Sequence, residues 1–170
     1  MRMKSIVLID HEPFTIRRKE LFYVDKLRDF GFNVEIWDIS QYVLPGLTLP
    51  GEIEDPCLSI IGSILDLKRL ISSKKLEDTI FIVECWKGWH TKEIFKLLSD
   101  KKCLLVRIDL FGNTYVGETI RDKFVRLFSS MFWRVIRDKV ISYAFFCYKK
   151  VYHIKDYDRV FASSIYVKRT

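Results

Sequence analysis

Short apolar runs alternate with amphipathic stretches along much of this chain. The first run, residues 5–9, is aliphatic, mostly β-branched, and ends at Asp10, a pattern typical of a strand that is buried on both faces of a parallel sheet. After a polar break at residues 10–13, apolar positions recur at helical spacing over residues 16–30, and Gly31 then supplies a helix end. A second run at residues 34–38 follows, so the opening predicts a β-α-β unit.

The same alternation continues to the end of the chain. Residues 39–56 contain three of the four prolines and are expected to form an irregular loop. Further strands are predicted at residues 57–61, 79–83, 104–108 and 157–162, and helices at residues 62–71, 91–98 and 119–150, the last with a break near Ser142. This order indicates the α/β class: a three-layer sandwich with a mostly parallel, five- to six-stranded Rossmann-like sheet, formed by residues 1–170 as a single domain.

The charge and the cysteines of the chain indicate which partners and which cellular compartment to expect. The net charge of +7 and the pI near 9.2 are compatible with an anionic partner or with a merely basic surface. The four cysteines are widely spaced without a CxxC pair, which is typical of buried thiols in a reducing compartment. No signal peptide and no membrane-length apolar segment are found, so a cytoplasmic location is expected, with peripheral contact at the inner face of the cell membrane as an extension of it.

Candidate site residues follow the predicted strands, because ligands of open α/β sheets bind beyond the carboxyl ends of the strands. They are Asp10, His11 and Glu12 after the first strand, Asp38 after the second, Glu84, Trp86, Trp89 and His90 after the fourth, and Arg107 and Asp109 at the fifth.

Each of these positions has two readings. His11 is a candidate general base oriented by Asp10, or a solvated loop residue beside a capping carboxylate. Glu84 is an acid–base or hydroxyl-binding group, with His90 as its partner, or an ion-pair member. The two loop tryptophans either stack on a sugar or pack internally. Arg107 either binds an anion or pairs with a neighbouring carboxylate.

The predicted helix over residues 119–150 carries a basic stripe beside a wide apolar face. The membrane- or anion-binding candidates on that stripe are Lys123, Arg126, Arg134 and Arg137. The helix is interpreted either as a surface helix on the sheet with a solvated basic rim, or as a face that rests on an anionic membrane or meets a lipid-linked substrate.

Several nucleotide and catalytic motifs are missing from the sequence. There is no GxGxxG after the first strand, no GxxxxGK[ST], no GxSxG and no HExxH, so no cofactor and no metal are expected. Nucleic acid is not an expected partner, since the aromatic residues fall mostly in strands and apolar helix faces rather than among Lys and Arg on one exposed surface.

Four stretches resemble the amino-terminal half of bacterial glycosyltransferases of the GT-B architecture that serve capsular or surface polysaccharide assembly. They are KSIVLIDHEPFTIRRKELFYVDKLRDFGFNVEIWDIS, DTIFIVECW, LLVRIDLFGN and DYDRVFASS. The resemblance implies a Rossmann-like domain that binds the sugar acceptor, with a lipid-linked sugar among the candidates, and carries the base, His11 or Asp10. It also implies that a second domain or subunit holds the nucleotide-sugar, because the donor-binding half is absent. The first loop departs from the family in having no glycine.

We therefore expect the acceptor-binding domain of a metal-independent glycosyltransferase that is not active alone. The alternative is a non-catalytic module of flavodoxin or receiver type, which would use its basic helix to bind a partner or a membrane surface.

Overall fold

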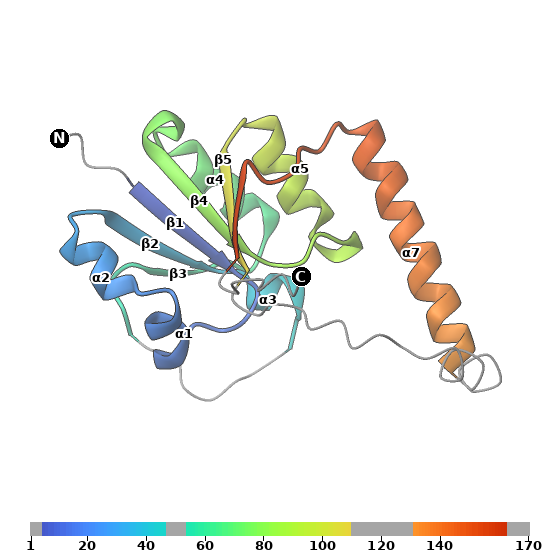
Figure 1. Ribbon diagram of the computed structural model, residues 1–170, viewed down its shortest axis with the longest axis horizontal. Helices are drawn as coiled ribbons and strands as arrows, with labels where there is room; N and C mark the ends of the chain where they lie inside the picture. Colours follow the sequence, from blue (N-terminus) through green and yellow to red (C-terminus); the bar gives the residue numbers. More distant parts are fainter. Residues whose placement is uncertain (1–4, 47–53, 110–130, 163–170) are drawn as a thin grey trace, which may run out of the picture.

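The fold is an α/β sandwich built on one parallel sheet (Figure 1). The computed structural model describes residues 5–46, 54–109 and 131–162. The sheet has six strands in the order β3-β2-β1-β4-β5-β6, and every neighbouring pair runs parallel. The strands are β1 (Ser5–Asp10), β2 (Asn33–Asp38), β3 (Leu58–Ile60), β4 (Thr79–Glu84), β5 (Leu104–Asp109) and β6 (Arg159–Ala162).

Helices lie on both sides of this sheet, with α1 and α2 on one side and α4 and α5 on the other (Figure 1). The described helices are α1 (Ile16–Leu21), α2 (Val24–Asp29), α3 (Ser40–Val43), α4 (Ile64–Ser72), α5 (Lys92–Asp100) and α7 (Met131–Val151), with the 3-10 turns η1 (Leu76–Asp78) and η2 (Trp89–Thr91). The predicted three-layer, Rossmann-like class is confirmed, and the sheet is parallel throughout its six strands.

The two faces of the sheet bury alternate residues of the same strand. Val7 and Ile9 of β1 pack in the cluster that includes Leu67 of α4 and Phe95 of α5. Their neighbours Ile6 and Leu8 pack in the cluster on the side of α1 and α2. This period of two explains why β1 is apolar from Ile6 to Ile9, since both faces of the strand are covered.

The predicted helix over residues 16–30 is two short helices rather than one. Tyr23 has φ 51, in the left-handed region, and this residue separates α1 from α2. The break turns Phe22 into the core, where it is 4% exposed, whereas Phe30, predicted on the apolar face, is 79% exposed. An uninterrupted helix could not place Phe22 and Val24 together against the sheet, because residues two apart face different directions.

Two further predictions are corrected. The predicted loop over residues 39–56 contains the short helix α3 directly after β2. The last helix, α7, is continuous through Ser142, so the predicted break there is wrong, while its predicted start near residue 119 lies outside the described residues.

None of the described side chains of α7 is buried, and α7 lies beside η2 and α5 rather than on the sheet (Figure 1).

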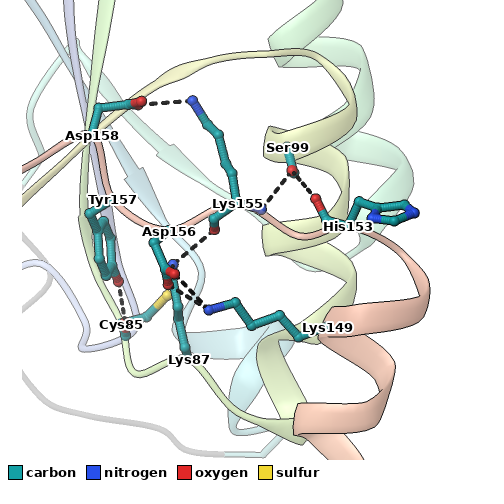
Figure 2. Close-up of polar contacts among 9 residues, drawn as sticks. All are labelled: Cys85, Lys87, Ser99, Lys149, His153, Lys155, Asp156, Tyr157 and Asp158. Atoms are coloured by element: carbon teal, nitrogen blue, oxygen red, sulfur yellow. Dashed lines mark hydrogen bonds and ion pairs between the residues drawn. The ribbon is translucent and has the colours of Figure 1, made fainter.

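The segment between α7 and β6 is tied to the rest of the fold by polar contacts (Figure 2). The ammonium of Lys87 donates to the main-chain oxygen of Lys155 and to Asp156, at 3.0 and 3.2 Å. Lys149 of α7 also donates to Asp156, at 2.7 Å. Asp158 accepts from the main-chain N–H of Leu105 at 2.7 Å. These bonds place β6 beside β5 and fix the carboxyl end of α7.

Two leucines on α4 provide a test of the packing. Leu67 is 1% exposed and Leu65 is 63% exposed. We expect Leu67→Ala to lower the free energy of unfolding by about 2–5 kcal/mol, because it leaves a cavity between α4 and the sheet. Leu65→Ala should change it by less than about 0.5 kcal/mol. Urea unfolding followed by circular dichroism measures both, and equal effects would contradict this placement of α4.

Candidate functional site

Three carboxylates lie at the carboxyl edge of neighbouring strands. Asp10 ends β1 and stands in register with Asp38 of β2 on one side and Glu84 of β4 on the other. The chain connects outward from β1 in both directions, so the β1–β4 boundary is the topological switch point of the sheet. Ligands of open α/β sheets bind at this point, because the loops after the two strands diverge there.

Asp10 is a buried carboxylate held by Arg18 and by the following loop. It is 1% exposed, and its Oδ2 accepts from Arg18 Nε at 2.7 Å and lies 2.5 Å from Arg18 Nη2. Its Oδ1 accepts from the main-chain N–H of Glu12 at 3.1 Å. Burial raises the pKa of Asp10, and Arg18 opposes that rise. Both oxygens thus accept hydrogen bonds within the protein, and the predicted catalytic role of Asp10 stays a prediction.

His11 lies across the switch point, against β4. Its Nδ1 is 2.6 Å from the main-chain oxygen of Glu84 and 3.6 Å from Asp10 Oδ1. A carbonyl oxygen can only accept, so Nδ1 carries the proton and the neutral ring has its lone pair on Nε2. Nε2 is therefore the ring atom with which the predicted base would accept a proton. The ring is positioned by the main-chain oxygen of Glu84 as well as by Asp10, the partner that the sequence predicts.

Glu84 is a half-buried carboxyl group with an altered proton affinity. Burial raises its pKa to about 7, against the lowering effects of a hydrogen bond from Ile108 N–H and of the Arg107 charge. The bond from Ile108 reaches Glu84 Oε1 at 2.8 Å. A carboxyl group with this pKa exchanges its proton near neutral pH, which suits an acid–base or hydroxyl-binding role.

Trp86 presents an aromatic surface beside the histidine. Its ring centroid lies 4.5 Å from that of His11 in an edge-on arrangement, and the side chain is 44% exposed. The Thr91 hydroxyl holds the loop, since it accepts from Gly88 N–H at 3.1 Å and donates to Trp86 O at 2.6 Å. A Cβ at Gly88 would come within 3.1 Å of Trp86 Cδ1. Glycine at this position therefore lets the indole lie against the loop backbone.

Asp38, in contrast to the exposed Trp86, is buried. It is 4% exposed, and its two oxygens accept from Phe14 N–H at 3.0 Å and from Ser40 N–H at 2.8 Å. The carboxylate thus joins the loop after β1 to the start of α3. Its predicted substrate-binding role stays a prediction, and the bonds that the structure shows are structural ones to the main chain.

The remaining predicted residues are distributed around this edge. Glu12 is exposed and paired with Arg18 at 3.2 Å. Trp89 lies at the contact with α7, where its ring is 6.1 Å from that of Tyr148, so the two loop tryptophans do not form one surface. His90 is exposed on η2, and the histidine that meets Glu84 is His11.

Arg107 of β5 is half-buried, with its guanidinium 5.9 Å from the Tyr157 ring. Asp109 ends β5, and its side chain lies outside what the structure describes.

The predicted basic stripe is described only in part. Lys123 and Arg126 lie outside the described residues. Arg134 and Arg137 are exposed on α7, and Arg137 lies 3.4 Å from Asp138. Over the described ranges, no helix is long and apolar enough to cross a membrane, and no three His, Cys, Asp or Glu side chains are grouped to hold a metal ion.

Arg18 is a residue of this site that the sequence analysis did not identify. Its side chain is 11% exposed and bridges Asp10 and Glu12. Its position in the first turn of α1 could have indicated this contact. A residue in the first turn of a helix that follows a strand points back toward the end of that strand. Together, Asp10, His11, Glu84, Trp86 and Arg18 form a site that can accept a proton at His11 Nε2 beside an exposed aromatic face.

Glu84 also predicts how stability depends on pH. Its pKa is about 7 in the folded protein and 4.5 in the unfolded chain, so between these values the folded state binds more protons and the free energy of unfolding falls as pH rises. Glu84→Gln keeps an acceptor for Ile108 N–H and cannot ionise. We expect the variant to gain about 1–3 kcal/mol relative to the parent between pH 5 and pH 8, measured by urea unfolding at each pH. A constant difference between the two proteins would contradict the raised pKa.

No family model matches the chain, and no curated protein matches it. Among solved structures, it is similar to dTDP-glucose 4,6-dehydratase from Bacillus anthracis str. Ames in complex with NAD, with 10% identity and a TM-score of 0.43. The alignment covers 95% of this chain and 53% of that one, so the chain spans about half the length of the enzyme it matches.

Proposed function

We propose that the domain binds a sugar acceptor at the carboxyl edge of its sheet and acts as the acceptor side of a GT-B glycosyltransferase in polysaccharide biosynthesis. The observation that carries the proposal is the grouping of an exposed indole, Trp86, with His11 and Glu84 at the switch point. Aromatic faces pack against the apolar side of sugar rings, while neighbouring acid and imidazole groups bind the hydroxyls.

The chemistry assigned to this site is a proton transfer. His11 Nε2 accepts the proton of an acceptor hydroxyl while that oxygen forms a bond to the anomeric carbon of the donor sugar. The bond from that carbon to the nucleotide diphosphate breaks, and the diphosphate leaves with the electron pair. A second domain or subunit holds the donor, so this chain contributes acceptor binding and the base.

The loop after β1 supports acceptor binding over dinucleotide binding. In dinucleotide-binding folds this loop is rich in glycine, so that its backbone can approach a pyrophosphate. Here the loop contains Glu12, Pro13 and Phe14. Phe14 is 1% exposed, and Arg18 directs its guanidinium to Asp10 and Glu12. The helix that follows, α1, has only six residues, so the loop and α1 together form a poor pyrophosphate cradle.

A second candidate is a non-catalytic module that binds its partner through α7. The favouring observation is that none of the described side chains of this 21-residue helix is buried. A helix of that length on a domain of this size normally buries one face.

Acceptor binding is tested with a glycan array that includes lipid-linked saccharides, followed by titration of the best ligand. We expect Trp86→Ala to weaken binding about tenfold, corresponding to 1.4 kcal/mol, because the stacking surface is lost. His11→Ala should weaken it by a similar factor, since a hydroxyl-binding group is removed.

The matched controls are His90→Ala and Leu65→Ala, which change an exposed histidine and an exposed apolar side chain outside the cluster. Neither should alter affinity. Binding that is unchanged in the Trp86 and His11 variants, or absent for every saccharide, would overturn the proposal.

A further inference from the structure

The last described helix has one face turned wholly to solvent. Val140, Tyr143, Cys147 and Val151 recur at intervals of three or four residues, so they form a line along α7. Val140 is 61% exposed, Tyr143 70% and Val151 69%, and Cys147 is also exposed. Phe146, at the border of this line, is 53% exposed. We call these five side chains the outward face of α7.

The opposite face of α7 attaches the helix to the domain. Tyr148 donates to Glu93 of α5 at 2.9 Å, and its ring meets those of Trp89 and Tyr152. Lys92 of α5 lies 3.5 Å above the Trp89 ring. Lys149 is bonded to Asp156 in the segment that follows the helix (Figure 2). These contacts fix the rotation of the helix, so the exposure of the outward face follows from how α7 is attached.

Charge indicates which partner would cover this face. The helix carries five basic side chains against one acidic side chain, Asp138. Lys139 and Lys150 directly flank the outward face, and Lys150 lies 5.5 Å from the Phe146 ring. Long basic side chains beside aromatic and aliphatic ones are the arrangement of interfacial helices, whose apolar residues enter the boundary of a lipid layer while ammonium groups meet anionic headgroups.

We propose that the outward face of α7 docks on an anionic lipid surface, with Lys139 and Lys150 as headgroup contacts. The proposal does not depend on the sugar-binding site, which lies at the edge of the sheet. It also uses a different set of residues from the basic stripe expected from the sequence, because the contacts of Tyr148 and Lys149 decide which side of the helix faces away from the domain.

Two other occupants fit less well. A second copy of the chain would bring two helices with the same excess of positive charge together, which opposes their pairing. A nucleic acid would need a continuous basic surface with aromatic faces available for stacking. Here the outward face itself carries no basic side chain, and Lys139 and Lys150 only flank it, so it is not a continuous basic surface.

The experiment is co-sedimentation of the full chain with vesicles of phosphatidylcholine alone and of phosphatidylcholine with 30% phosphatidylglycerol. We expect binding to the anionic vesicles only. Lys139→Gln with Lys150→Gln should weaken it about 25-fold, since each basic side chain near such a surface contributes roughly a fivefold gain. Val140→Ser with Tyr143→Ser should weaken it at least tenfold, because less apolar surface is buried.

The matched controls are Lys68→Gln and Leu65→Ser on α4, which change an exposed basic and an exposed apolar side chain away from α7. Both should bind as the parent does. Circular dichroism melts of each variant check that the fold is kept, as expected for exposed positions. No binding to anionic vesicles, equal loss in the controls, or a dimer in sedimentation that the α7 variants abolish would overturn the proposal.

Discussion

Burial of β1 and β4 on both faces is the constraint on which the rest of the molecule depends. Both strands are almost entirely apolar, and helices cover the sheet on each side. Because the strands are parallel and in register, this burial also aligns their carboxyl ends, so that Asp10 and Glu84 stand next to each other. The site is therefore a consequence of core packing: the same register that buries Leu8 beside Ile82 brings His11 to the main-chain oxygen of Glu84.

Some polar groups at this edge are buried and stabilise the loops, whereas other side chains there are exposed to solvent. Asp38 and Asp10 are buried and use both oxygens on neighbouring groups. Next to these carboxylates, the rings of His11 and Trp86 meet in a T-shaped arrangement, and Trp86 is exposed to solvent. Glu84 lies between these extremes, and its half-buried position explains the raised pKa. The buried, hydrogen-bonded carboxylates thus hold the loops that carry the exposed side chains.

The α7 helix is attached by a second, separate set of contacts. The ring contact between Trp89 and Tyr148 joins its inner side to η2 and α5. The ion pairs of Lys87 and Lys149 with Asp156 hold its carboxyl end. Apart from Tyr148, which packs against one core cluster, the described side chains of the helix lie outside the two cores that the sheet organises. This separation explains how a long helix can keep an apolar face in solvent while the domain remains well packed.

By itself, the sequence determined the class of fold and the sheet edge at which the candidate residues gather, since strand runs closed by Asp10, Asp38 and Glu84 are a local signal. It also determined most strand positions to within one or two residues. Tertiary structure decided which polar residues are exposed, because Asp38 is bonded to Phe14, 24 residues away, and Arg18 of α1 is paired with Asp10 at the end of β1. It likewise decided the break at Tyr23 and the solvent-facing side of α7. Helical periodicity shows that a helix has an apolar face, but only packing decides whether that face is covered.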